Sequence, residues 1–178
     1  MWLLLFDNYT CIFNLKNHKF QKNIEKKAQI LAKRLIKKLN ICGLLAVEMF
    51  ITKSGDILIN EVAPRPHNSG HHTIEAIETS QFEQHLRGIM NLPLGSTNMR
   101  HPSVLLNLVG AEGYSGDVKI EGWENALNTE GCHIHLYGKK TTKPFRKMGH
   151  ATFLNKNIGK ALENAQFLKE NFKIKSNE

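Results

Sequence analysis

The chain has 178 residues, of which 41% are hydrophobic and 22% are charged, a composition that argues against both a disordered segment and a membrane protein. The formal net charge of +8 favours anionic partners such as nucleotides, sugar phosphates or nucleic acid. The three cysteines are scattered and odd in number, which suits a reducing compartment, so we expect a cytoplasmic protein.

The first predicted element is an amphipathic helix over residues 21–40. Apolar residues recur there at helical spacing, and lysine and arginine residues occupy the other side. Such a basic helix can bind nucleic acid or a membrane surface, but a solvated face is the more frequent role. Residues 1–20 form an atypical N-terminal segment, whose apolar stretch is too short for a membrane span.

A β-hairpin is predicted next. Residues 44–51 and 57–62 form its strands, and Lys53-Ser54-Gly55-Asp56 forms the tight turn between them. A capping-box pattern at residues 80–83 then begins a helix that runs to about Met90.

A domain boundary follows, so the sequence divides into residues 21–98 and 99–178. The second part is predicted to be small and β-rich. Its expected elements are strands at 104–109, 133–137 and 151–154, a short helical piece at 123–127 and a terminal helix at 158–172.

Two glutamates are predicted to face each other across the hairpin. If the turn is centred between Ser54 and Gly55, Glu48 lies opposite Glu61 on the same face, where two like charges repel. Their apolar neighbours on both faces predict burial on each side. Buried carboxylates without His or Cys suit magnesium, and Asn60 could add a carbonyl ligand.

The alternative is an edge hairpin whose glutamates face solvent, and a shift of register by one residue would also separate the pair.

The loop after the hairpin has the composition of an anion site. Arg65 offers a planar fork for a carboxylate or phosphate, and Asn68 or Ser69 could cap the following helix. A group of histidines, namely His67, His71 and His72, raises the alternative of zinc, although no zinc-protease spacing is present.

These segments resemble a known family. The runs Ala46–Phe50 and Asn60–His71 are similar to the ATP-grasp core of the 5-(carboxyamino)imidazole ribonucleotide synthases. The resemblance covers about residues 21–172, and its further motifs are Thr79–Arg87, Leu92–Gly95, Asn107–Gly110, Tyr137–Lys139 and Arg146–His150. It implies an α+β fold, with the C-terminal half of an ATP-grasp domain at 21–98 and a small β-rich C-terminal domain at 99–178.

The resemblance also implies a reaction. ATP phosphorylates bicarbonate to carboxyphosphate, and the carboxyl group passes to the amine of 5-aminoimidazole ribonucleotide in purine synthesis. By the same resemblance Glu48 and Glu61 are ligands of Mg²⁺ and, with Asn60, belong to the ATP site.

Two further groups of residues receive roles in the same way. Arg65, His67 and Asn68 would hold bicarbonate or carboxyphosphate. Lys139 and Arg146 would bind the phosphate of the ribonucleotide, although without the resemblance this segment reads as an exposed basic loop. Phe145 occupies a position where members of the family often have glycine.

The family's N-terminal domain and first ATP-grasp segment do not correspond to any part of this sequence. We therefore expect negligible activity from the chain alone, with a homodimer or a separately encoded N-terminal half as possible partners. Two other functions stay open: a noncatalytic module that uses its basic segments to bind nucleic acid or protein, and another ATP-grasp carboxylase or ligase.

Overall fold

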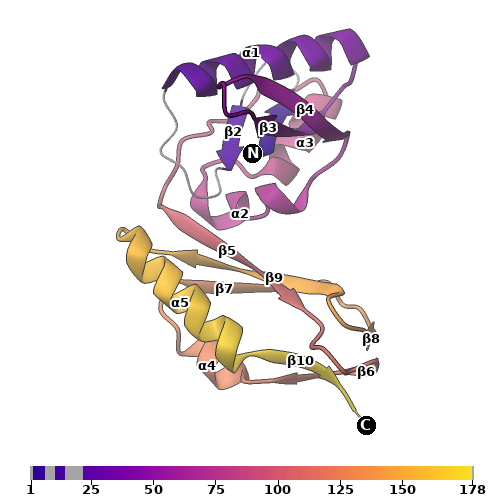
Figure 1. The fold of residues 1–178 in the computed structure, drawn as a ribbon, viewed down its shortest axis with the longest axis vertical. Coiled ribbons are helices and arrows are strands. Elements are labelled where there is room, and N and C mark those ends of the chain that lie inside the picture. The colour runs from indigo at the N-terminus through magenta and orange to yellow at the C-terminus, as the bar shows by residue number, and fades with distance from the viewer. Residues whose placement is uncertain (1, 7–10, 15–21, 178) are drawn as a thin grey trace. The chain divides into compact units, whose positions relative to one another are not determined.

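The computed structural model describes the backbone of residues 2–6, 11–14 and 22–177 and the side chains of residues 23–177. The chain divides into two compact units, Met1–Asn98 and Met99–Glu178, which are described separately (Figure 1).

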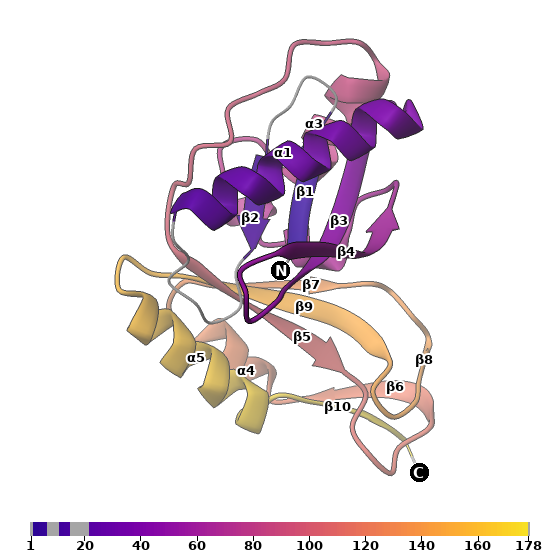
Figure 2. The ribbon, with the colours of Figure 1, turned by 45° about the horizontal axis from the view of Figure 1, so that its top comes forward.

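Unit 1 is built on a four-stranded antiparallel sheet in the order β2-β1-β3-β4. Its strands are β1 (Trp2–Phe6), β2 (Cys11–Asn14), β3 (Leu44–Ile51) and β4 (Ile57–Ala63). Helix α1 (Lys22–Leu39) lies across the sheet in Figure 2. The predicted helix and hairpin are therefore present, and residues 1–20 contribute two strands that the sequence analysis did not anticipate.

The core of unit 1 lies between α1 and β3. Leu45, Val47 and Met49 alternate along β3 and are fully buried, and they pack against Ala28 and Ala32 of the helix. The small alanines let the helix approach the strand closely, while Lys26, Lys27, Lys37 and Lys38 are exposed on the side away from this core.

Three helical pieces follow the hairpin: the 3-10 helix η1 (Asn68–Gly70), α2 (Thr73–Ala76) and α3 (Gln81–Ile89). The predicted capping box is confirmed, because the Ser80 side chain accepts a hydrogen bond from the backbone N–H of Glu83. Unusually, α3 buries Gln81 and Gln84 and exposes Phe82 and Leu86.

Unit 2 contains two three-stranded antiparallel sheets, ordered β5-β9-β7 and β10-β6-β8. Its elements are β5 (Ser103–Val109), β6 (Gly116–Glu121), α4 (Trp123–Leu127), β7 (Cys132–Leu136), β8 (Thr141–Thr142), β9 (Lys147–Leu154), α5 (Ile158–Asn171) and β10 (Lys173–Ser176). The predicted helices and strands are present, but β9 begins four residues before the predicted strand, and β6, β8 and β10 were not predicted.

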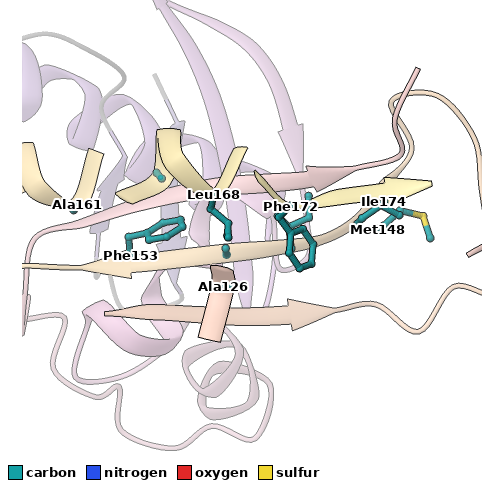
Figure 3. Packing of buried hydrophobic residues seen from close by; sticks show 10 residues of the cluster. Ala126, Met148, Phe153, Ala161, Leu168, Phe172 and Ile174 are labelled. Atoms are coloured by element: carbon teal, nitrogen blue, oxygen red, sulfur yellow. The ribbon is translucent and has the colours of Figure 1, made fainter. Parts of the chain in front are cut away.

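A second hydrophobic core holds unit 2 together (Figure 3). Phe153 and Ala151 of β9 are fully buried and pack with Leu168 of α5. Phe172 and Ile174 extend this core from the end of α5 into β10. Because each unit has its own buried cluster, each has the means to fold around its own core.

Among the residues that the structure describes, no helix is both long enough and apolar enough to cross a membrane.

Candidate active site

Glu48 and Glu61 face each other across the hairpin, as the sequence predicted, but the register that brings them together is different. Near the turn Ile51 pairs with Ile57, one residue out of step with the predicted alignment. A β-bulge then inserts Asn60 opposite the step between Glu48 and Met49. Without this extra residue Glu61 would point to the opposite face of the sheet, so the bulge is what aligns the two carboxylates.

The predicted burial on both sides is confirmed at the start of β3, where Leu44–Val47 are all buried, but it is wrong around the glutamates and along most of β4. Glu61 is exposed and Glu48 is only partly buried. Phe50 is 54% exposed and Leu58 53% exposed. These two residues pair with each other and share the face of the glutamates, and α1 covers only the other face. The sequence pattern correctly indicates that this face of the hairpin is apolar, but it does not show whether another part of the chain covers the face.

The donor set at this face fits magnesium. The opposed side chains supply carboxylate oxygens, and Mg²⁺ commonly takes one or two carboxylates while water and phosphate oxygens fill its remaining positions. Within the described residues, no group of three or more His, Cys, Asp or Glu side chains is placed to hold a metal ion by itself.

In the loop after β4, Arg65 follows Pro64, and its side chain is exposed. One of its guanidinium nitrogens, Nη1, donates to the carbonyl of Pro66 at 3.1 Å, and its backbone N–H donates to the carbonyl of Ala63 at 2.9 Å. The remaining guanidinium N–H groups give Arg65 the means to contact an anion.

His67 and Asn68 lie at the start of η1. The Nδ1 atom of His67 accepts a hydrogen bond from the backbone N–H of Ser69 at 3.2 Å and lies 3.0 Å from the Ser69 hydroxyl. The side-chain Oδ1 atom of Asn68 is buried and has no hydrogen-bond partner among the described residues. Because an unpaired buried acceptor costs roughly 1–3 kcal/mol, Asn68 is the kind of group that a ligand or a water molecule would satisfy.

Two buried polar residues that the sequence analysis did not single out hold this loop. The side chain of Gln81 bonds both backbone groups of His67 and the ring of His71. The hydroxyl of Thr73 donates to the carbonyl of Gly70 at 2.6 Å and accepts from the backbone N–H of Gln81. A polar residue on the inward side of a helix was the only sequence signal for this role.

His72 is the most buried histidine of the loop. Burial lowers the pKa of its imidazole, while its hydrogen bond to the carbonyl of Ser69 and the charge of Glu75 act in the opposite direction. The ring therefore favours the neutral form, with its proton on the Nδ1 atom that donates to Ser69.

In unit 2, Lys139 and Arg146 lie in the segment that connects β7 to β9. The ammonium of Lys139 donates to the carbonyl of Lys147 at 2.6 Å and lies 5.7 Å from the centre of the Tyr137 ring. Arg146 donates to the carbonyl and hydroxyl oxygens of Thr141 at 2.9 and 3.1 Å. Both cations are thus tied down on one side and remain partly exposed.

Tyr137, which lies under the Lys139 ammonium, is linked to two histidines of the neighbouring strands. The Tyr137 hydroxyl lies 3.1 Å from Nδ1 of His150. His150 is buried, and its ring stacks on that of His135 with centroids 4.6 Å apart.

The backbone of Phe145 is left-handed, with φ of 62°, and its side chain is 70% exposed. Glycine adopts this conformation without penalty, which agrees with the expectation of glycine at this position. The backbone N–H of Phe145 donates to the carbonyl of Gly110 at 2.9 Å, so the turn is retained with a bulky residue.

Sequence comparison identifies the class of both units. Residues 5–82 match the ATP-grasp domain, and residues 103–164 match the phosphoribosylaminoimidazole carboxylase C-terminal domain. The first match extends the resemblance toward the N-terminus, beyond the residue 21 at which the sequence analysis began it. The protein is therefore an ATP-grasp protein with a mixed helix and sheet fold.

Within that class, the chain is similar to part of the N5-carboxyaminoimidazole ribonucleotide synthases. It is 48% identical over 134 residues to the N5-carboxyaminoimidazole ribonucleotide synthase of Bacillus subtilis, which covers 75% of this chain and 34% of the relative. The synthetase structure from Thermotoga maritima matches 99% of this chain and 52% of its own chain, with a TM-score of 0.89 and 44% identity.

A third relative was solved with ligands. The Aspergillus clavatus synthase in complex with ADP and 5-aminoimidazole ribonucleotide has a TM-score of 0.79 and 32% identity. That match covers 95% of this chain and 49% of the relative. The chain thus spans about a third of the curated Bacillus relative and about half of the two solved structures.

Proposed function

We propose that the chain is part of an ATP-dependent ligase that carboxylates 5-aminoimidazole ribonucleotide with bicarbonate through carboxyphosphate. The observation that carries this proposal is the bulged hairpin that places Glu48 opposite Glu61, directly before a loop that offers the exposed guanidinium of Arg65. A relative solved with ADP and 5-aminoimidazole ribonucleotide supports this substrate.

In this proposal Glu48 and Glu61 hold Mg²⁺, with Asn60 beside them on the bulge. When bound, the metal supplies positive charge that offsets the charge of the ATP phosphate oxygens. The exposed position of Glu61 suits this role, because ATP and its metal must approach from the uncovered face of the hairpin.

The loop after β4 would position the carboxyl donor. Arg65 binds the anionic oxygens of bicarbonate or carboxyphosphate through its guanidinium fork. Asn68 places an amide beside the same anion, and His67 places an imidazole that Ser69 holds. Holding two reactants in one orientation is itself a large part of catalysis.

Lys139 and Arg146 would bind the phosphate of the ribonucleotide. The carbonyl bonds that restrain both side chains reduce the conformational freedom that is lost when a phosphate binds. We also propose a cytoplasmic location, which suits the few, scattered cysteines of the sequence.

A complete ATP site is expected to need a partner, either a second copy of the chain or a separately encoded N-terminal half. The exposed apolar residues beside the glutamates, Phe50 and Leu58, are the kind of surface that a partner covers. Sedimentation of the chain alone would distinguish the two partners, since only self-association produces a concentration-dependent dimer.

The decisive test is ATP-dependent phosphate release with magnesium, bicarbonate and 5-aminoimidazole ribonucleotide. We expect release near background from the chain alone, and release above background when the N-terminal half of a relative is added as a separate chain. The variant Glu61→Gln should abolish the restored release, whereas the exposed hairpin variant Lys53→Gln should not. Restored release that survives Glu61→Gln would contradict the metal role.

A further inference from the structure

Gln81, at the first turn of α3, makes an unusual number of contacts for a single buried side chain. It is fully buried. Its Oε1 atom accepts from the backbone N–H of His67 at 2.9 Å, and its Nε2 atom donates to the carbonyl of the same residue at 2.9 Å. The same Nε2 atom lies 2.7 Å from Nδ1 of His71.

These contacts fix the orientation of the Gln81 amide. A backbone N–H can only donate and a carbonyl can only accept, so the atom beside the N–H of His67 is oxygen and the atom beside its carbonyl is nitrogen. Both hydrogens of the amide nitrogen are then used, one on the carbonyl of His67 and one on Nδ1 of His71. The contact with His71 is therefore a donation from Gln81 to the ring.

The protonation of two histidine rings follows from this orientation. Nδ1 of His71 accepts a hydrogen bond, so the neutral ring carries its proton on Nε2. Nδ1 of His67 accepts from the backbone N–H of Ser69, so its neutral ring also carries the proton on Nε2. The ring of His71 is further held by stacking on Phe82, with centroids 5.5 Å apart.

We propose that Gln81 is a positioning residue of the anion-binding loop, and that it fastens the backbone at His67 and holds the ring of His71 in its Nε2–H form. This inference rests on the proposed function for the identity of the anion. A carboxyphosphate carries negative charge at both ends, so its oxygens require donors rather than lone pairs. Gln81 meets that need by occupying the Nδ1 acceptor of His71 and by fastening the backbone at His67.

The direct test is nuclear magnetic resonance of the chain with ¹⁵N-labelled histidine, which reports the nitrogen that bears the hydrogen in each ring. His67 and His71 should both show the Nε2–H form, and the substitutions His67→Gln and His71→Gln assign the two signals. In the variant Gln81→Glu, a carboxylate replaces the donor at Nδ1 of His71, and we expect that ring to change to the Nδ1–H form.

Gln84 provides a matched control on the same helix. It is also fully buried, and its amide makes the same pair of backbone bonds, to the N–H and the carbonyl of Gly95 at 3.0 and 2.7 Å. The variant Gln84→Glu therefore buries the same charge and loses the same donor. Both variants should lower the melting temperature by comparable amounts, but only Gln81→Glu should alter the ring of His71.

Phosphonoformate, a stable mimic of carboxyphosphate, tests the functional part when it is added with magnesium to the chain combined with the N-terminal half of a relative. Its binding should shift the His67 and His71 signals of the wild-type chain, and Gln81→Glu should weaken that binding about tenfold or more, the effect of losing a hydrogen bond to a charged group. Gln84→Glu should leave the affinity unchanged.

The outcomes separate the two proposals. A wild-type His71 in the Nδ1–H form, or a ring that Gln81→Glu leaves unchanged, overturns the role of Gln81 whatever the anion does. The wild-type measurement alone decides this point if the variant does not fold. If both rings have the predicted Nε2–H form but phosphonoformate does not shift their signals, the result would instead count against the anion site of the proposed function.

Discussion

At the scale of single residues, Phe145 stores backbone strain. A left-handed conformation costs a residue with a Cβ atom about 1–2 kcal/mol, and Phe145 adopts φ of 62° while exposing its ring. We therefore expect Phe145→Gly to stabilise the chain by about 1 kcal/mol, measured as an increase in the melting temperature of unit 2. Phe145→Ala removes the ring but keeps the Cβ atom and should give no such gain. Equal effects from both variants would show that the ring and not the backbone is responsible.

His72 should make the stability of unit 1 depend on pH. Burial lowers its pKa below the usual 6.5, so in acid the unfolded chain takes up a proton before the folded chain does. Stability then falls as the pH decreases through 6.5 toward the folded-state pKa, and it is retained above pH 6.5.

Denaturant unfolding at pH 7.5 and 5.5 would measure this effect. The variant His72→Gln should lose less stability between the two pH values than the wild type, and the exposed control His133→Gln should behave as the wild type. A wild-type slope in His72→Gln would assign the pH dependence to other groups.

At the scale of elements, α3 packs on the start of β3 through two glycines. A Cβ atom on Gly88 would lie 2.9 Å from the Cα atom of Gly43, which itself has φ of 92°. Alanine favours a helix by about 1 kcal/mol over glycine, whereas overpacking costs about 1–3 kcal/mol.

Gly88→Ala should therefore destabilise unit 1 by up to about 2 kcal/mol, measured by denaturant unfolding. The control is Gly159→Ala in α5, where the nearest neighbour is the side-chain oxygen of Asn157 at 3.1 Å, which can move. If Gly88→Ala proved as mild as the control, the close contact of α3 with β3 would not limit the packing.

Elements with strong local signals could be predicted from the sequence, and those that depend on distant partners could not. The apolar spacing predicts α1 and α5 to within one or two residues, and the pattern at Trp123 predicts α4. Strand β6 alternates apolar and polar residues, but its partner in the sheet is β10, which lies far along the sequence at residues 173–176. That pairing has no local signal, and the glycines around β6 are typical of a connection.

The part of the candidate site that depends on local pattern could be predicted from the sequence, and the part that depends on distant contacts could not. The position of Glu61 opposite Glu48 follows from the hairpin pattern, although the bulge at Asn60 that produces it does not. The contacts of Gln81 depend on how α3 folds back on the loop, which no spacing in the sequence specifies. The roles of Arg65, Lys139 and Arg146 stay predictions.

At the scale of the whole molecule, the two separate cores predict two separable folding units. Residues 99–178 expressed alone should give a cooperative melting transition that is independent of magnesium, because the paired glutamates lie in the other unit. In the full chain, magnesium at ten times its dissociation constant should stabilise unit 1 by about 1.4 kcal/mol.

Circular dichroism and calorimetry of both chains would measure these transitions, with Glu61→Gln as the control for specific binding. An unfolded 99–178 chain would show that unit 2 depends on unit 1. A magnesium effect that persists in Glu61→Gln would assign the binding to another place.

The position of β4 at the edge of its sheet also affects how fast its backbone amides exchange hydrogen with the solvent. Strand β3 is hydrogen-bonded to β1 on one side and to β4 on the other, whereas β4 is the last strand of the order. In deuterated water the amides of β3 should therefore exchange slowly, and those amides of β4 that point away from β3 should exchange within the shortest labelling times. Glu48 would thus lie on a strand whose amides exchange slowly, and Glu61 on a neighbouring edge strand where the outward-pointing amides exchange fast.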